Sequence, residues 1–189
     1  METYDKGKIG RCIAWTGDHQ VYEYDSAEVI KFSKFDYFLG FEKAKDKSLL
    51  DIELCRNFFG RYFLDTRVAI SSKENRVALV QLKIVGRYLV PRDLKNETIK
   101  NQFIDIMHGY NHLVAAGHSP VDLIGGKGVL IRGMSNIFVT PNDRLYLFDA
   151  TLLDSKDFPL LCRPFLSALF GLAIHMQTLI IRSFESNLS

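Results

Sequence analysis

The first part of the chain shows short apolar or alternating runs that turn residues separate. Three such runs lie at residues 8–15, 20–24 and 28–32, and the turns between them contain glycine, aspartate and serine. Runs of this length that are rich in β-branched and aromatic residues are typical of strands. The pattern therefore predicts three short antiparallel strands at the start of the chain.

A helical pattern follows, and two more strands come after it. Between residues 42 and 59 apolar side chains recur at helical spacing among charged ones, and Gly60 ends the pattern. Residues 67–71 and 77–85 are interpreted as strands on either side of a polar turn. The order β-β-β-α-β-β predicts a five-stranded antiparallel sheet with one helix over residues 1–87.

The second part of the chain, residues 88–189, has a mainly helical pattern. A helix predicted at residues 98–116 precedes a glycine-rich stretch at 125–128, which we interpret as a loop. Residues 129–131 indicate a brief strand, and residues 137–148 indicate a hairpin. We therefore expect an α+β protein with a sheet-bearing first lobe and a reduced, mainly helical second lobe.

A last helix is predicted at residues 164–184. Its stretch Phe165–Ile181 carries no formal charge. A helix that spans a bilayer needs about 20 predominantly apolar residues, whereas this one contains His175 and Gln177. We therefore expect a buried core helix, and contact with a membrane is the less favoured interpretation.

Composition and charge exclude several classes of function. Charged residues make up 24% of the chain and the net charge is +2, with basic residues scattered, so no nucleic-acid-binding surface is indicated. The cysteines Cys12, Cys55 and Cys162 form neither a metal-ligand pair nor an even disulfide framework. The first residues lack the apolar segment of a secretory signal. These observations predict a cytoplasmic protein.

Two polar residues flank the predicted hairpin. Asn136 precedes it and Asp149 follows it, thirteen positions later. Because a hairpin folds the chain back, it brings the residue before it and the residue after it to the same end. The alternative is an ordinary hairpin with an amide before it and a capping acid after it.

Together with the order of the elements, this hairpin resembles the protein-kinase-like superfamily over roughly residues 10–155. In size and layout the chain is similar to compact bacterial types, the lipopolysaccharide-core sugar kinases and the PhoP-regulated kinase-like proteins. The resemblance implies a two-lobed fold with ATP and Mg²⁺ as cofactors. It also implies that Asn136 and Asp149 are the metal ligands.

Further residues receive roles only through this resemblance. Lys31, in Val29-Ile30-Lys31, matches the strand lysine that contacts the α- and β-phosphates, and Glu53 matches the helix glutamate that orients it. Gly17 and Val21 take the place of the loop and strand that cover the nucleotide. Without the resemblance, Lys31 and Glu53 are ordinary solvated surface residues.

The catalytic loop departs from the kinase pattern. Its aspartate should stand five positions before Asn136, where this chain has Ile131. Asp122 and His118 are the candidates for a displaced base, although residues in such loops are more often turn formers. The phosphate-covering loop also holds one glycine, Gly17, where kinases typically have three. The catalytic loop is therefore degenerate.

The sequence leaves three functions open. The first is an atypical phosphotransferase that moves the γ-phosphate of ATP to an unidentified protein or small-molecule acceptor, with Lys31, Glu53 and Asp149 as catalytic residues. The second is a pseudokinase that regulates a partner without catalysis. The third is an unrelated α+β interaction protein in which the motif matches are accidental.

Overall fold

The computed structural model describes the chain in five stretches, which are residues 2–15, 19–33, 36–71, 74–156 and 158–188. Two compact units make up the chain. Unit 1 comprises Met1–Glu53, Leu64–Lys83 and Asp157–Pro159, and unit 2 comprises Leu54–Phe63, Ile84–Lys156 and Leu160–Ser189. The expected lobes, residues 1–87 and 88–189, stay a prediction.

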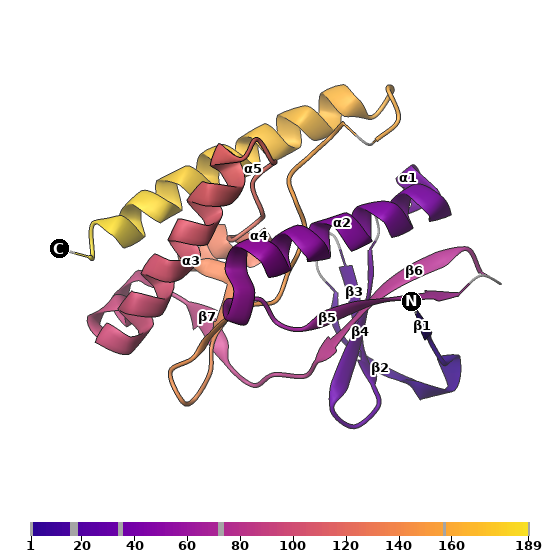
Figure 1. Ribbon diagram of the computed structural model, residues 1–189, viewed down its shortest axis with the longest axis horizontal. Helices are drawn as coiled ribbons and strands as arrows, with labels where there is room; N and C mark the ends of the chain where they lie inside the picture. Colours follow the sequence, from indigo (N-terminus) through magenta and orange to yellow (C-terminus); the bar gives the residue numbers. More distant parts are fainter. Residues whose placement is uncertain (1, 16–18, 34–35, 72–73, 157, 189) are drawn as a thin grey trace. The chain divides into compact units, whose positions relative to one another are not determined.

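Unit 1 is built on a mixed sheet, which Figure 1 shows in indigo to magenta. Among the described residues six strands pair in the order β1-β5-β6-β4-β3-β2. These strands are β1 Glu2–Thr3, β2 Ile9–Trp15, β3 His19–Tyr24, β4 Glu28–Ser33, β5 Thr66–Ser71 and β6 Arg76–Leu82. β1 runs parallel to β5, and every other pair is antiparallel. The prediction of five antiparallel strands is therefore wrong in one respect, because a sixth, parallel strand is added.

One face of this sheet carries the apolar core of unit 1. The buried cluster there consists of Tyr4, Tyr24, Ile30, Phe32, Ala69, Ala78 and Val80. Tyr4 and Phe32 meet edge to face, with ring centroids 5.5 Å apart. Because side chains alternate along a strand, Lys31 lies on the opposite face from Ile30 and Phe32.

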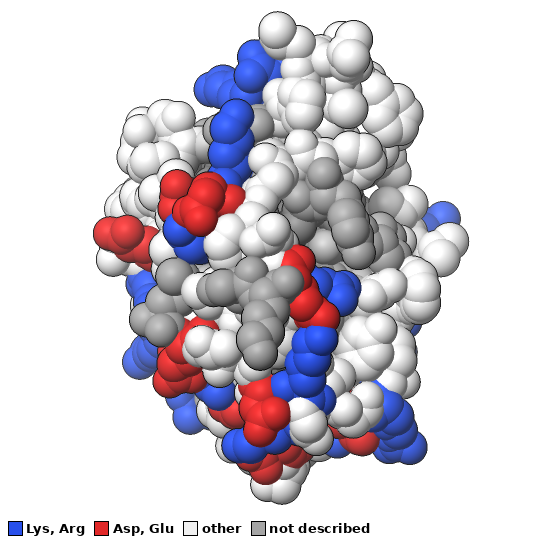
Figure 2. Space-filling view, turned by 90° about the vertical axis from the view of Figure 1, so that its right-hand side faces the viewer, with Lys and Arg blue, Asp and Glu red and all other residues white. Residues whose placement is uncertain are grey.

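Charges of both signs are interspersed on the face that Figure 2 shows. Neither sign gathers into a surface of its own there. A surface that attracts nucleic acid needs basic side chains grouped on one face. Among the described residues, this face therefore shows no such surface.

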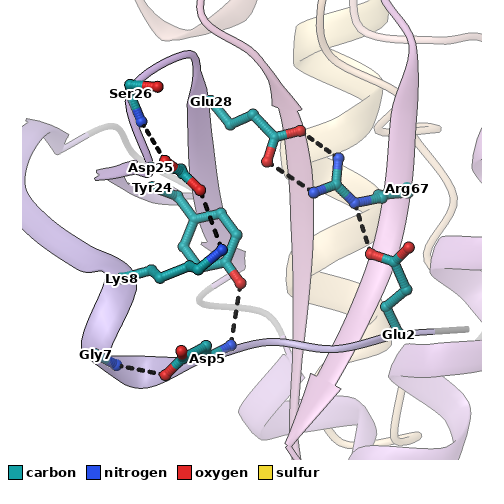
Figure 3. Close-up of polar contacts among 9 residues, drawn as sticks. All are labelled: Glu2, Asp5, Gly7, Lys8, Tyr24, Asp25, Ser26, Glu28 and Arg67. Atoms are coloured by element: carbon teal, nitrogen blue, oxygen red, sulfur yellow. Dashed lines mark hydrogen bonds and ion pairs between the residues drawn. The ribbon is translucent and has the colours of Figure 1, made fainter.

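Arg67 on β5 is the centre of an ion-pair cluster in unit 1 (Figure 3). Its guanidinium donates to the two carboxylate oxygens of Glu28 at 2.5 and 2.7 Å and to Glu2 at 2.9 Å. In the sheet order β6 lies between β5 and β4, so the Arg67–Glu28 pair reaches across one strand. The hydrogen bonds from Arg67 hold the pKa of the Glu28 carboxyl below its ordinary value.

Helices complete the two units. Beside the short helices η1 Lys6–Lys8, α1 Asp36–Leu39, η2 Gly60–Tyr62 and η3 Pro91–Lys95, the longer ones are α2 Phe41–Phe59, α3 Glu97–Ala115, α4 Gly125–Ile131 and α5 Arg163–Glu185. Phe103 of α3 stacks on Phe184 of α5, with ring centroids 5.1 Å apart, and Figure 1 shows these two helices side by side. The Asn96 side chain caps α3 by accepting from the Thr98 and Ile99 amides. Unit 2 therefore has its own packed core.

Unit 2 also contains a small sheet. Its strands are β7 Arg87–Leu89, β8 Met134–Val139 and β9 Leu145–Leu147, in the order β7-β8-β9. The hairpin expected at residues 137–148 is thus present as β8 and β9. Taken with unit 1, this arrangement confirms the α+β class.

The glycine-rich segment is different from its prediction. Residues 125–128 are not a loop and residues 129–131 are not a strand, because both belong to α4. Glycine disfavours a helix by about 1 kcal/mol relative to alanine, but here close packing requires it. A Cβ atom on Gly128 would lie 2.6 Å from the carbonyl oxygen of Gly133. Close packing against the residues that flank the helix therefore overrides the low helix propensity of glycine in this segment.

Candidate functional site

The β8–β9 hairpin brings Asn136 and Asp149 to the same end of the small sheet. Ile137 pairs with Leu147, and the Phe148 amide donates to the Asn136 carbonyl oxygen at 3.1 Å. Asp149 therefore follows the residue that lies directly opposite Asn136. Both side chains are buried, with 7% of their surface exposed.

The Asp149 carboxylate orders the chain that follows it. Its Oδ1 accepts hydrogen bonds from the Thr151 amide at 3.0 Å and from the Thr151 hydroxyl at 2.8 Å. A carboxylate with two such bonds is fixed in orientation before any ligand arrives. The chain after Asp149 is held at the same time.

A further acid, Asp122, lies beside Asn136. Asn136 donates from Nδ2 to the Asp122 carbonyl oxygen at 2.8 Å, and the Asp122 amide donates to the Thr151 carbonyl oxygen at 2.9 Å. An antiparallel bridge between Val121 and Leu152 continues this contact. The chain around Asp122 is therefore bonded both to Asn136 and to the segment that follows Asp149.

The Asp122 carboxylate is itself oriented by the backbone. Its Oδ1 accepts from the Ile124 amide at 3.1 Å and from the Gly125 amide at 2.9 Å. The Ser135 amide and hydroxyl both donate to the Ile124 carbonyl oxygen, at 3.2 and 2.6 Å. The chain therefore leaves this point at Ile124, forms α4 and returns to it at Ser135.

Sequence reasoning favoured a turn-forming role for Asp122, and its spacing gave no sign of a catalytic one because α4 is inserted between it and Asn136. The two residues are 14 positions apart, whereas the kinase pattern places them five apart. Gly125 is the signal that could have indicated the insertion. Its φ is +55°, and a Cβ atom there would lie 2.6 Å from Asn136 Oδ1, so only glycine fits against the amide.

Gln177 of α5 fixes the segment on the other side of Asp122. Its side chain is fully buried. Its Oε1 accepts from the Leu123 amide at 2.7 Å, and its Nε2 donates to the Val121 carbonyl oxygen and the Tyr110 hydroxyl, each at 3.0 Å. Burial raises the pKa of Tyr110, so its hydroxyl stays neutral. Helices α3 and α5 therefore hold this segment in place.

In unit 1 the structure brings Lys31 and Val21 together. Lys31 on β4 pairs with Val21 on β3 and with Leu79 on β6. Residues directly opposite on neighbouring strands point to the same face. The Lys31 side chain is 6% exposed, which is unusual for a lysine. Lys31 is therefore no ordinary solvated surface residue.

The helix carboxylates are placed differently from each other. Glu53 is exposed on α2, whereas Asp51 is 7% exposed and its Oδ2 accepts from Lys47 Nζ at 2.7 Å. Asp51 therefore becomes a second candidate for the acid that orients Lys31, and the role of Glu53 stays a prediction. Gly17 lies outside the described residues.

The oxygen donors of unit 2 suit a hard cation. Within the part of the chain that the structure describes, there is no group of three or more His, Cys, Asp or Glu residues that could hold a metal ion. Mg²⁺ is usually bound through one or two carboxylates, with phosphate and water oxygens as its other ligands. Asn136 and Asp149 fit that smaller requirement, and their roles stay predictions.

No family model and no curated protein matches this chain. Solved structures do match. The Lpg2603 kinase of Legionella pneumophila bound to IP6 has a TM-score of 0.50 and 15% identity, over 91% of this chain and 59% of that one. The apo form of PpkA-294 has a TM-score of 0.49 and 14% identity, over 79% of this chain and 60% of that one. This chain thus spans about three-fifths of the length of either structure. The likeness to the Legionella kinase shows that this chain has a kinase-like fold.

Proposed function

We propose that this protein is an atypical ATP-dependent phosphotransferase in which Asp122 takes the place of the catalytic-loop aspartate. The observation that carries this proposal is the 2.8 Å hydrogen bond from Asn136 to the Asp122 carbonyl oxygen. It lies in the segment that is also bonded to the chain after Asp149. Because this bond fixes the backbone of Asp122 beside the Asn136 amide, the Asp122 carboxylate could act on a phosphate group bound at Asn136.

The remaining roles in this proposal are those that the resemblance to kinases implies. Asn136 and Asp149 supply an amide oxygen and a carboxylate oxygen to Mg²⁺, which when bound neutralises charge on the phosphates. Lys31 contacts the phosphates, and Val21 beside it packs against the base. Asp51 or Glu53 orients Lys31.

Asp122 acts on the acceptor. In the proposed step the acceptor oxygen bonds to the γ-phosphorus of ATP, the bond to the β–γ bridging oxygen breaks, and ADP leaves. The hydroxyl proton of the acceptor passes to the Asp122 carboxylate. A general base of this kind contributes roughly 10²–10⁴ in rate, and most of the remainder comes from positioning and charge neutralisation.

The acceptor is a protein or a small molecule in this proposal, and the protein is cytoplasmic. The three cysteines Cys12, Cys55 and Cys162 are free thiols, which supports a reducing compartment. Free thiols do not discriminate between the two kinds of acceptor.

The second candidate is a pseudokinase that binds nucleotide without transferring phosphate. Two backbone N–H groups already bond to Oδ1 of Asp122, which favours a structural use of that carboxylate. The two candidates share the nucleotide site, and they differ in whether Asp122 affects turnover.

Nucleotide binding is tested by thermal unfolding with ATP and Mg²⁺. A ligand at 100 times its dissociation constant stabilises the folded state by about 2.7 kcal/mol. We expect the wild type to be stabilised, and we expect Lys31→Ala and Asp149→Ala to lose that effect. Glu185→Gln, an exposed acid on α5, is the control and should keep it. An unchanged melting temperature of the wild type at saturating ATP contradicts both candidates.

Turnover then separates the candidates. We expect Asp122→Asn to keep the stabilisation by ATP and Mg²⁺ and to lower release of labelled phosphate or autophosphorylation by roughly 10²–10⁴. Equal turnover in wild type and Asp122→Asn would show that Asp122 is not the base. Stabilisation by ATP with no turnover in the wild type would favour the pseudokinase.

The same assay tests the two helix acids. Asp51→Asn and Glu53→Gln remove one carboxylate each with little change in size. We expect the variant that lacks the true partner of Lys31 to bind ATP more weakly, and the other to match the wild type. Identical binding by both variants would remove the helix acid from the proposed site.

A further inference from the structure

Thr151, two positions after Asp149, bonds to that carboxylate through two of its groups. Its amide donates to Asp149 Oδ1 at 3.0 Å, and its hydroxyl donates to the same oxygen at 2.8 Å. The bond from the amide is the usual local turn of an aspartate, and any residue but proline can form it at position 151. The bond from the hydroxyl needs a serine or a threonine. The hydroxyl is therefore the part of this contact that depends on the choice of residue.

The backbone on both sides of the Thr151 side chain is fixed. The Thr151 carbonyl oxygen accepts from the Asp122 amide at 2.9 Å. The next residue, Leu152, is 5% exposed and forms an antiparallel bridge with Val121. A side chain that branches at Cβ has few rotamers. The hydroxyl is therefore directed at Asp149 before any ligand binds.

Helix α5 holds the segment around Val121 in turn. Gln177 is fully buried, and its Nε2 donates to the Val121 carbonyl oxygen at 3.0 Å. By length and composition alone α5 could cross a bilayer. A bilayer-spanning helix would have to give up this bond, so α5 is part of the folded unit.

The expectation of a buried core helix is right for only one side of α5. Phe184 is fully buried, whereas Phe165 is 71% exposed and Leu172 is 59% exposed. In the most apolar window of the helix, 28% is buried. The expectation is therefore wrong for the exposed side, and the support for the segment beside Thr151 comes from the buried one.

The two bonds from Thr151 occupy one oxygen of the Asp149 carboxylate. A carboxylate has about four lone pairs, shared equally by its two oxygens. The amide and the hydroxyl of Thr151 both bond to Oδ1, so a metal ion at Asp149 is held through Oδ2. Without the hydroxyl, a lone pair of Oδ1 becomes accessible and both oxygens can bond to one ion.

Mg²⁺ and Ca²⁺ differ in how they use a carboxylate. Ca²⁺ takes about 6–8 oxygen ligands in a flexible arrangement and accepts both oxygens of one carboxylate, whereas Mg²⁺ demands near-ideal octahedral geometry with shorter bonds. A carboxylate that bonds through one oxygen fits the octahedral arrangement. A carboxylate that bonds through both oxygens fits the larger and more flexible ion.

We propose that the Thr151 hydroxyl makes Asp149 a ligand through one oxygen and thereby selects Mg²⁺ over Ca²⁺ beside the bound nucleotide. Thr151 is a positioning residue, because it acts through Asp149. This inference rests on the nucleotide and metal site of the proposed function, but not on Asp122 as the base. It therefore applies to the phosphotransferase and to the pseudokinase alike.

Thermal unfolding at a fixed ATP concentration, titrated separately with MgCl₂ and CaCl₂, tests the role of Thr151. The melting temperature as a function of metal concentration gives an apparent dissociation constant for each ion. The affinity of ATP itself for either ion is the same in every titration, so it cancels when proteins are compared. We expect Thr151→Val, which removes the hydroxyl and keeps the branched shape, to lower the preference for Mg²⁺ over Ca²⁺ roughly tenfold, the effect of about one hydrogen bond to a charged group.

Three further variants isolate the hydroxyl. Thr151→Ala removes the same donor without a methyl group against the carboxylate, and should lower the preference in the same direction. Thr151→Ser keeps the hydroxyl and should keep the preference of the wild type. Thr178→Val removes a threonine hydroxyl that donates to the Ile174 carbonyl oxygen on α5, and should also keep it. Far-UV circular dichroism checks that each variant is folded.

The outcomes separate this inference from the proposed function. An unchanged preference in both Thr151→Val and Thr151→Ala overturns the role of Thr151, while stabilisation of the wild type by ATP and Mg²⁺ still supports the nucleotide site. A preference lowered equally in Thr151→Ser also overturns it, because the hydroxyl is then not the cause. A wild type that ATP stabilises with neither ion contradicts the proposed function itself, and this inference with it.

Discussion

Two polar networks, one in each unit, differ in how much water reaches them. In unit 1 the side chains of Arg67 and Glu28 are 39% and 21% exposed. In unit 2 the Gln177 side chain is fully buried and every hydrogen-bonding atom of its amide group has a partner. Exposed ion pairs stabilise a protein little, whereas a buried polar group that loses its partner costs its full desolvation energy. The network in unit 2 should therefore control the stability of the candidate site.

The largest effect should come from Gln177→Ala. This change leaves the Leu123 amide, the Val121 carbonyl and the Tyr110 hydroxyl without their buried partner. We expect a loss of about 3 kcal/mol or more in the free energy of unfolding, measured by urea denaturation. Thr178→Ala, at the next and exposed position, should change it little. If Gln177→Ala lowers the free energy of unfolding no more than Thr178→Ala does, the buried network of unit 2 does not stabilise the protein more than the exposed ion pairs of unit 1.

Gly125→Ala should have the next largest effect. The added Cβ atom would lie 2.6 Å from Asn136 Oδ1 and from Ser135 Oγ, at a φ of +55°. We expect a loss of about 2 kcal/mol in stability, together with weaker stabilisation by ATP and Mg²⁺ because Asn136 is displaced.

The matched control for this change is Gly126→Ala. A Cβ atom on Gly126 would meet nothing within 4 Å, and alanine favours a helix over glycine by up to about 1 kcal/mol. The control should therefore be as stable as the wild type or more stable. If the two substitutions change the free energy of unfolding equally, the contact between the added Cβ atom and Asn136 does not affect stability.

A smaller effect is expected for Arg67→Met in unit 1. After allowance for solvent screening, loss of its bonds to Glu28 and Glu2 should cost about 1 kcal/mol at neutral pH. The folded state lowers the pKa of Glu28, so this stabilisation is present above the unfolded pKa of about 4.3 and is lost as the pH falls through the folded value. Urea midpoints of wild type and variant should therefore converge as the pH falls below the lowered folded pKa of Glu28. A difference that grows on acidification would contradict this assignment.

The smallest effect is expected for Lys8→Gln. Lys8 and Asp25 lie 3.1 Å apart, and their side chains are 51% and 50% exposed (Figure 3). The pair raises the pKa of Lys8, and the Ser26 amide together with Lys8 lowers that of Asp25. Salt screens exposed pairs of this kind, so we expect no measurable change in the urea midpoint. A clear loss would show that exposed ion pairs matter more in unit 1 than the comparison allows.

Hydrophobic periodicity predicted most of the elements, because a helix or strand that buries one face has apolar residues at the spacing of that face. The last strand of unit 1 was expected at residues 77–85 and is β6 Arg76–Leu82, and the two-residue β1 has no pattern that could indicate it. The resemblance to kinases is confirmed for the fold. The roles of Lys31, Asn136 and Asp149 stay predictions.

Two features of the candidate site could not be predicted because they depend on contacts distant in the sequence. Asp51 and Glu53 stand two positions apart on α2, and packing decides which of them is buried. Asp122 and Asn136 are joined by a hydrogen bond across 14 positions. A motif with fixed spacing does not describe either arrangement.

Hydrogen bonds between Ser135 and Ile124 hold the two ends of the α4 segment together. The length of that segment therefore does not set the distance between Asp122 and Asn136. Since Ile124 and Ser135 are hydrogen-bonded to each other, the number of residues between them can change without moving Asp122 away from Asn136. A longer loop closed in this way costs little additional entropy. Proteins with the same acid and amide at a different spacing would therefore be found by comparing structures, although a search for a motif of fixed spacing would miss them. The segment α4 is also a position where a different sequence could be inserted without moving the two residues apart.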